Sequence, residues 1–352
     1  MAVRIAINGF GRIGRNFLRA LLERDAGNAG RVAAAASGTE LELVAINDIT
    51  SREASAHLLQ YDSTHGRLRD PVQLTEGGFR VGGHEFLVYA ETDPKALPWG
   101  DLGIDVVVES TGRFTTRAAA MAHVEAGARR VIISAPAKDV DATFVVGVNE
   151  NEFDPGAHVV VSNASCTTNC LVPMVKVLED SFGLSQGLMT TVHAYTNDQE
   201  LLDLGRDNLR RARAAAVNVV PSTTGAARAT SLVLTEMAGR LDGTSLRVPV
   251  VDGSITDLTA VLATAASVDD VNAAFREASV SERLAGIIEY NEAEIVSSDI
   301  VGTSASCTFD STLTMAIPVD EQRSLVKVMG WYDNEWGYSN RLLDLCAVVG
   351  RA

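Results

Sequence analysis

Residues 3–15 read VRIAINGFGRIGR. A strand-like run, VRIAIN, comes directly before Gly9, Gly11 and Gly14, and residues 12–22 have the apolar spacing of a helix. Such a glycine-rich turn between a strand and a helix lets the backbone approach a pyrophosphate, which then lies at the helix N-terminus. The segment therefore predicts the first strand–helix unit of a dinucleotide-binding sheet.

The segment after the first helix supports the same interpretation. Residues 41–47 form the next predicted strand, and Asp48 follows it at the position of a carboxylate that binds ribose hydroxyls. The separation from Gly14 exceeds the roughly 20 residues that are usual for this motif. The excess lies in residues 25–40, which are rich in Gly, Ala and Ser and which we interpret as a surface insertion. An extended helix through residues 33–36 is the alternative.

Two patterns of secondary structure follow one another along the chain. In the first part, strands alternate with a helix, which predicts parallel βαβ units: strands 86–90, 106–110, 131–134 and 158–162, and helix 115–126. In the second part, the strands have the character of an antiparallel sheet covered by helices: strands 188–194, 245–251, 254–263 and 327–332, and helices 168–182, 226–234 and 268–278, with a last helix over 334–349. The predicted fold is α/β, a doubly wound (Rossmann) parallel sheet plus an α+β domain with a mainly antiparallel sheet.

A cysteine and a histidine stand where these two parts meet. Residues 162–170 read SNASCTTNC and residues 190–196 read TTVHAYT, so Cys166 lies between a strand and a helix and His193 on the next strand. The N–H groups of a helix N-terminus favour a thiolate, and an imidazole nearby can act as acid and base. An inert thiol beside a core histidine is the alternative, which the two motifs together disfavour.

Length and composition limit the classes of function. The 352 residues suggest two domains, and 46% hydrophobic with 21% charged residues is ordinary for a globular enzyme. A net charge of −15 argues against nucleic acid or an anionic membrane as partner, so anionic substrates need locally placed cations. We expect no membrane span, because no apolar run approaches the roughly 18 residues required. The N-terminus has no signal pattern, so we expect the cytoplasm.

The four cysteines do not suggest a disulfide framework in a chain of this length. Cys166 and Cys170 would share one helix face, but only His193 could join them as a further metal ligand. We therefore expect no metal.

The chain resembles phosphorylating glyceraldehyde-3-phosphate dehydrogenase in the segments quoted above and in residues 331–338, which read WYDNEWGY. The resemblance runs in order from about Val3 to Val348. It implies an NAD-binding domain over residues 1–165, completed by a C-terminal helix over 334–352, and a catalytic domain over 166–333.

The resemblance also implies the reaction. Cys166 would attack the aldehyde of glyceraldehyde 3-phosphate, His193 would act as acid and base, a hydride would pass to NAD, and inorganic phosphate would cleave the thioester. This is a step of glycolysis, and the family's native state is a homotetramer, with Arg210 and Arg213 expected near an interface.

The resemblance assigns further roles residue by residue. The substrate phosphate would be bound by Thr196, Asp198 and Arg247, with Asp198 orienting Arg247. The attacking phosphate would be bound by Ser165, Thr167, Arg211, Thr224 and Gly225. The cofactor would contact Gly9, Gly11, Gly14, the backbone N–H groups of Arg12 and Ile13, and Asp48, Thr111, Ser134, Asn334 and Tyr338. Asp48 followed by apolar Ile49 favours NAD over NADP, because a 2′-phosphate would be repelled.

Four positions depart from the family pattern. Thr92 replaces an arginine near the adenine, and Arg228 replaces a lysine. In one loop, Gly205 replaces a proline and Asp207 reverses a charge. None removes a catalytic group. Two other functions stay open: a dehydrogenase acting on erythrose 4-phosphate, and a non-catalytic, moonlighting binding protein on the same scaffold.

Overall fold

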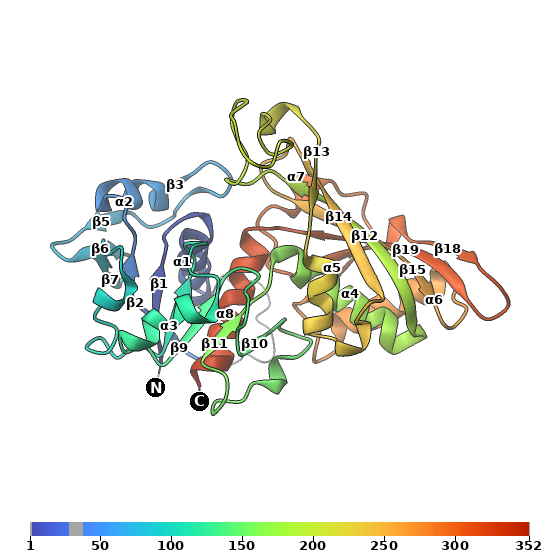
Figure 1. The fold of residues 1–352 in the computed structure, drawn as a ribbon, viewed down its shortest axis with the longest axis horizontal. Coiled ribbons are helices and arrows are strands. Elements are labelled where there is room, and N and C mark those ends of the chain that lie inside the picture. The colour runs from blue at the N-terminus through green and yellow to red at the C-terminus, as the bar shows by residue number, and fades with distance from the viewer. Residues whose placement is uncertain (1, 28–37, 352) are drawn as a thin grey trace. The chain divides into compact units, whose positions relative to one another are not determined.

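The computed structural model describes residues 2–27 and 38–351. It divides into two compact units, the first made of Met1–Ser165 with Tyr338–Ala352 and the second of Cys166–Gly337 (Figure 1). Most of the predicted insertion over residues 25–40 lies outside the described residues, although the first helix continues to Asp25.

The first unit contains a mostly parallel sheet. Among the described residues it has nine strands, in the spatial order β10 (Ala142–Thr143), β11 (Val160–Ser162), β9 (Arg130–Ile133), β8 (Val106–Glu109), β1 (Val3–Asn8), β2 (Leu41–Asn47), β7 (His84–Tyr89), β6 (Gly78–Val81) and β5 (Val72–Leu74). The pairs from β10 to β7 are parallel, and β6 and β5 add an antiparallel edge. Strands β8 and β9 are buried along their whole length, as expected for the centre of a parallel sheet.

Helices and short turns complete the first unit. They are α1 (Arg12–Asp25), α2 (Arg52–Gln60), α3 (Arg117–Glu125), the 3-10 turns η2 (Pro94–Ala96) and η3 (Glu150–Glu152), and the small ribbon of β3 (Tyr61–Asp62) and β4 (Gly66–Arg67). Gly11 precedes α1 and has no side chain that could cap the first N–H groups of this helix.

The second unit contains a mainly antiparallel sheet. Among the described residues its order is β13 (Val220–Thr223), β14 (Leu241–Val248), β12 (Leu184–Ala194), β15 (Ser254–Leu262), β19 (Ser324–Tyr332), β17 (Cys307–Asp310) and β16 (Ile288–Asn291), with β18 (Met315–Pro318) also paired to β19. Only β12 with β14 and β16 with β17 are parallel pairs among these strands.

One face of this sheet is covered by the helix that begins at the cysteine. Helix α4 (Cys166–Phe182) packs against β12, β15, β17 and β19, and α6 (Val268–Val280) packs against α4. Burial alternates residue by residue along β15 and β19, because every second side chain points towards α4. The remaining elements of this unit are α5 (Ala226–Ala229), α7 (Ser297–Ile300), η4 (Ala215–Val217), η5 (Thr230–Leu232), η6 (Thr235–Met237) and η7 (Ser311–Leu313). The last helix, α8 (Trp336–Gly350), belongs from Tyr338 onwards to the first unit.

The predicted fold class is confirmed, with local corrections. The helix expected over 226–234 is wrong beyond Ala229, where the chain continues as 3-10 turns. The reason is that the hydroxyl of Thr230 donates to the carbonyl of Ala226, and that of Ser231 to Arg228, which competes with helix continuation. The antiparallel edge strands β5 and β6 were not predicted, because three and four residues are too few to show a clear alternation, although Phe79 and Val81 of β6 are buried.

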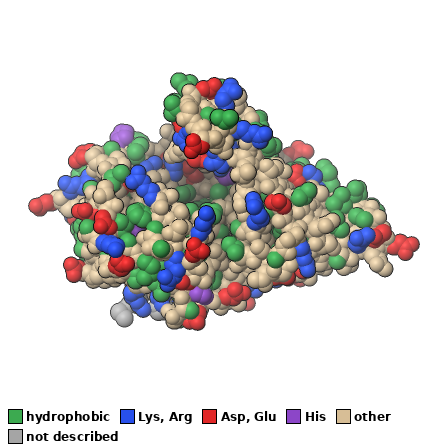
Figure 2. Space-filling view, viewed as in Figure 1, with side chains coloured by type: hydrophobic (Ala, Val, Ile, Leu, Met, Phe, Trp, Pro, Cys, Tyr) green, Lys and Arg blue, Asp and Glu red, His purple; other side chains and the backbone are tan. Residues whose placement is uncertain are grey.

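The described helices include none that is both long enough and apolar enough to cross a membrane. On the face shown in Figure 2, acidic and basic side chains are intermixed.

Candidate active site

Cys166 is placed by an unusual turn. Strand β11 ends at Ser162, and Ala164 then has a positive φ of 56°, a conformation that residues other than glycine adopt at a cost of about 1–3 kcal/mol. The hydroxyl of Tyr338 donates to the carbonyl of Ala164 at 2.9 Å and so supports the turn. Helix α4 begins immediately afterwards, at Cys166 itself and two residues earlier than predicted. The half-buried thiol therefore lies in the first turn of a 17-residue helix.

His193 lies opposite the thiol on β12. Its Nε2 is 3.5 Å from Cys166 Sγ, and its side chain is buried. The ring packs edge-on against Tyr332, with centroids 5.9 Å apart. The Tyr332 hydroxyl is in turn bonded to the hydroxyls of Thr167 at 2.9 Å and Thr191 at 2.8 Å. The structure thus brings the two predicted catalytic side chains together.

Tyr332 holds this pair in place, and it was not among the predicted site residues. Its position in the WYDNEWGY motif was the available signal. The bridge that its hydroxyl makes between α4 and β12 depends on the pairing of distant strands, which the motif does not show.

Burial controls the charge states of the pair. Burial raises the pKa of the Cys166 thiol to about 11, against the opposing charge of Arg247 and the backbone N–H of Thr167. Burial, together with the charge of Arg247, lowers the pKa of His193 to about 3. Both shifts favour the neutral thiol and imidazole over an ion pair near neutral pH. Burial thus opposes the predicted thiolate, whereas the charge of Arg247 and the backbone N–H of Thr167 favour it.

Arg247 reaches His193 because of strand register. Strands β12 and β14 pair in parallel with His193 beside Arg247. Arg247 Nη1 lies 2.6 Å from His193 Nδ1 and donates to the carbonyl of Ala194 at 3.1 Å. In this structure the guanidinium therefore contacts the ring nitrogen that faces away from the thiol.

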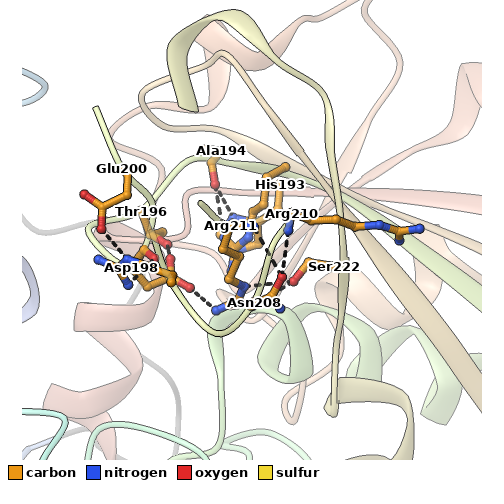
Figure 3. A network of polar contacts seen from close by, with 11 residues as sticks. His193, Ala194, Thr196, Asp198, Glu200, Asn208, Arg210, Arg211 and Ser222 are labelled. Carbon is orange, nitrogen blue, oxygen red and sulfur yellow. Dashed lines mark hydrogen bonds and ion pairs between the residues drawn. The ribbon is translucent and has the colours of Figure 1, made fainter. Parts of the chain in front are cut away.

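A second cation lies in the loop after β12. Figure 3 shows Asp198 and Arg211 directed towards each other, and the two side chains form an ion pair. Asp198 also accepts a hydrogen bond from Thr196, and Arg211 donates to Ser222 Oγ from Nε at 3.1 Å and from Nη2 at 2.8 Å. Asp198 was expected to orient Arg247. The Asp198 carboxylate instead accepts its side-chain hydrogen bonds from Thr196 and Arg211.

The charge of Asp198 is retained in this setting. Although burial opposes it, the hydroxyl of Thr196 and the charges of Arg247 and Arg211 hold the pKa of Asp198 below its usual value. The carboxylate thus partly neutralises the charge of Arg211, and an anion at this position would compete with the carboxylate for the guanidinium.

The other predicted phosphate residues lie at two backbone turns. Ser165 and Thr167 flank the thiol at the start of α4. Thr224 Oγ1 accepts the N–H of Ala226 at 3.2 Å, and Gly225 immediately precedes α5.

The first unit contains a cavity suited to a nucleotide. A cavity of about 230 Å³ is lined by residues at the carboxyl ends of the parallel strands, including Gly9, Gly11, Asp48 and Thr111. Gly9 has φ of +96°, and a Cβ there would lie 2.6 Å from the Thr111 nitrogen. A Cβ on Gly14 would lie 2.3 Å from the carbonyl oxygen of Gly9. These glycines are therefore required by the turn itself.

Two backbone N–H groups fix the position of the Asp48 carboxylate at the edge of this cavity. Its carboxylate accepts the N–H of Phe10 at 2.6 Å and that of Thr50 at 2.8 Å, while Ile49 beside it is exposed. Thr92, the position that departs from the family pattern, also lines this cavity. Among the described residues, no Lys or Arg side chain is hydrogen-bonded to Asp48. The Asp48 carboxylate therefore suits the ribose hydroxyls of NAD and would repel the 2′-phosphate of NADP.

The remaining predicted cofactor residues lie on strand ends or at turns. Ser134 follows β9 and donates to Ser110 Oγ at 3.0 Å, and Arg12 and Ile13 open α1. In the second unit, Ser254 donates to Asn334 Oδ1 at 2.6 Å. This bond orients the Asn334 amide so that its NH₂ can donate to a carboxamide oxygen. The residues present therefore fit NAD.

A nucleotide-binding parallel sheet in one unit and a cysteine–histidine pair in the other define a class, the dinucleotide-dependent oxidoreductases that use a cysteine nucleophile. Comparisons with known proteins give the family. Residues 3–117 match the model described as "Glyceraldehyde 3-phosphate dehydrogenase, NAD binding domain", and residues 165–334 match the one for the C-terminal domain of that enzyme.

Full-length relatives agree with the family models. The chain is 55% identical over 350 residues to glyceraldehyde-3-phosphate dehydrogenase of Streptomyces coelicolor, covering 99% of both chains. It is also 55% identical over 355 residues to the enzymes of the same name from Mycobacterium avium and Mycobacterium tuberculosis, covering 100% of each chain. The chain belongs to the glyceraldehyde-3-phosphate dehydrogenase family.

Two glycine substitutions distinguish the role of the glycine turn in stability from its role in NAD binding. Gly14→Ala places a methyl group against the Gly9 carbonyl and should lower the free energy of unfolding by about 1–3 kcal/mol. Gly11→Ala meets nothing within 4 Å, so stability should hardly change, but NAD should bind at least about tenfold more weakly because the pyrophosphate can no longer approach the backbone. Urea unfolding and calorimetric NAD titration measure both effects. Equal stability of the two variants would contradict this account of the turn.

Proposed function

We propose that this chain oxidises D-glyceraldehyde 3-phosphate to 1,3-bisphosphoglycerate with NAD and inorganic phosphate, a step of glycolysis. The observation that carries the proposal is the 3.5 Å contact between Cys166 Sγ and His193 Nε2 in the first turn of α4. Membership of the family supports the same reaction. Residues 1–165 with 334–352 would form the NAD-binding domain, and residues 166–333 the catalytic domain.

The first step is addition of the thiol to the aldehyde. Cys166 Sγ forms a bond to the carbonyl carbon, and the thiol proton passes through His193 Nε2 to the carbonyl oxygen, which gives a hemithioacetal. The backbone N–H of Cys166 and the His193 ring stabilise the negative charge that develops on this oxygen. His193 acts as the base that receives the thiol proton during the attack.

In the second step His193 removes the hydroxyl proton while a hydride leaves the same carbon. NAD, when bound, supplies the acceptor for that hydride. The product on Cys166 is a thioester.

In the third step an oxygen of inorganic phosphate attacks the thioester carbon. The carbon–sulfur bond breaks, His193 returns its proton to Cys166, and the acyl phosphate leaves. Thr196 and Arg247 would bind the substrate phosphate, and Ser165, Thr167, Arg211, Thr224 and Gly225 the attacking phosphate, with Asp198 holding Arg211. Short hydroxyls and planar guanidinium groups suit tetrahedral oxyanions.

A steady-state assay tests this function. NADH formation from glyceraldehyde 3-phosphate should continue only when inorganic phosphate is present. Cys166→Ser should abolish turnover, and His193→Asn should lower kcat by roughly 10²–10⁴, as expected for loss of a general acid and base. Equal turnover without phosphate would contradict the proposed last step and indicate hydrolysis. Greater activity on erythrose 4-phosphate, or none on either aldehyde, would support one of the two other functions.

We propose a homotetramer of identical chains. The support is the loop that follows β12, which projects from the sheet of the second unit (Figure 1) and exposes Leu201, Leu202 and Leu209 by 75–80% of their surface. Exposed apolar side chains gathered in one loop are typical of a protein interface. Arg213 and Asp203 form an ion pair within this loop, and this ion pair closes the segment that contains Gly205.

Light scattering tests the assembly. The native chain should have the mass of four subunits, a state that is common among symmetric oligomers. Leu202→Asp with Leu209→Asp should shift it to smaller species, because charges replace buried apolar contacts. Leu74→Asp is the matched control, since Leu74 is an exposed leucine on edge strand β5 and should leave the tetramer intact. A fully active monomer would contradict the proposal.

We also propose a cytoplasmic location. The mechanism requires Cys166 to stay reduced, and reducing compartments preserve such thiols.

A further inference from the structure

A buried network of polar side chains lies behind the nucleotide cavity of the first unit. Asn8 and Glu109 are the last residues of β1 and β8, and the parallel register of these strands places them side by side. His123 comes from α3, and Trp99 lies in the segment between η2 and β8. Each of these four residues exposes 2% of its surface or less. An acidic side chain is therefore enclosed among polar neighbours that must satisfy it.

Trp99 fixes the tautomer of His123. An indole nitrogen can only donate, and Trp99 Nε1 donates to His123 Nδ1 at 3.1 Å, so Nδ1 carries no proton. The ring proton therefore lies on Nε2, which donates to Glu109 Oε2 at 2.9 Å. In this arrangement the imidazole is neutral, and it adds no positive charge beside the Glu109 carboxylate.

The backbone of Glu91 fixes the other end of the network. The Glu91 N–H donates to Asn47 Oδ1 at 2.8 Å, so the NH₂ of Asn47 is the group that donates to Asn8 Oδ1 at 2.7 Å. The NH₂ of Asn8 then faces Glu109 and donates to its Oε2 at 2.6 Å. The direction of each hydrogen bond thus follows from a backbone N–H at one end and an indole N–H at the other.

Glu109 must accept hydrogen bonds at both of its oxygens. Oε2 accepts from Asn8 and His123, and Oε1 accepts from the backbone N–H of Thr111 at 2.8 Å and from the Thr111 hydroxyl. An ionised carboxylate, with about four lone-pair sites, satisfies all of these donors. A glutamine amide would set its own N–H groups against those of Asn8 and His123, so the position requires an acid.

The network joins two walls of the nucleotide cavity. Thr111 and Glu91, which it connects, both line this cavity. Glu109 holds the N–H of Thr111, on a turn so close to Gly9 that a Cβ on Gly9 would lie 2.6 Å from the Thr111 nitrogen. The position of the glycine turn, which is predicted to approach the pyrophosphate, therefore depends on a backbone segment that Glu109 holds.

We propose that Glu109 and His123 are positioning residues for NAD. Neither lines the cavity, and both act through Thr111 and Asn8, which do. The buried carboxylate holds the walls of the cavity in place before the cofactor arrives, so NAD does not have to order them on binding. The inference concerns NAD binding and holds whichever aldehyde the chain oxidises. Loss of the carboxylate should weaken NAD binding and leave the chemical steps at Cys166 unchanged.

Calorimetric titration of Glu109→Gln tests the proposal. NAD and ADP-ribose should both bind roughly tenfold more weakly or worse, because donors now oppose each other behind the cavity. The number of binding sites per chain, which a loss of folded protein would lower, should stay the same, and kcat at saturating NAD should stay within about twofold. Glu125→Gln is the matched control: it removes a carboxylate from the exposed end of α3 and should bind NAD like the native chain. Native NAD affinity in Glu109→Gln would overturn the proposal.

Exchanging the acid and the amide tests the network itself. Asn8→Asp alone places a carboxylate oxygen where the Asn8 NH₂ lies 2.6 Å from Glu109 Oε2, so like charges meet and NAD should bind more weakly. In Asn8→Asp with Glu109→Gln, the carboxylate at position 8 accepts from Asn47, His123 and the new amide, and NAD affinity should recover to within about threefold of the native value. This result supports the proposal even if Glu109→Gln alone does not fold. A double variant that does not fold, or binds NAD no better than the single variants, would refute it.

Discussion

The contact between Cys166 Sγ and His193 Nε2 is the interaction on which the rest of the site depends. It joins the first turn of α4 to the end of β12, and the hydroxyl bridge from Thr167 through Tyr332 to Thr191 fixes the separation of these two elements. The positive φ of Ala164 allows the helix to begin at the cysteine itself. Local strain at one residue thus positions the nucleophile.

Burial and charge oppose each other around this contact. Desolvation favours the neutral thiol and imidazole, whereas the helix N-terminus and Arg247 favour a thiolate. The same arginine lowers the pKa of His193 and so weakens the base.

Local sequence predicted the parts of the structure that depend on neighbours in the chain. The glycine turn after β1 and the cysteine at the start of α4 could be predicted because each joins one strand directly to one helix. The partners of Arg247 and Asp198 could not, because they depend on the parallel register of β12 with β14 and on the path of the following loop. The prediction of a helix beyond Ala229 was wrong because the hydroxyl of Thr230 donates a hydrogen bond to the backbone carbonyl of Ala226, a contact that the apolar spacing of the sequence does not reveal.

Trapping the covalent intermediate tests the central claim most directly. The protein is mixed with NAD and glyceraldehyde 3-phosphate in the absence of inorganic phosphate, quenched in acid, digested and analysed by mass spectrometry. The account predicts a phosphoglyceroyl thioester on Cys166, which disappears when inorganic phosphate is added before the quench. A native protein that forms NADH while Cys166 stays unmodified, or carries the acyl group on another cysteine, would contradict it.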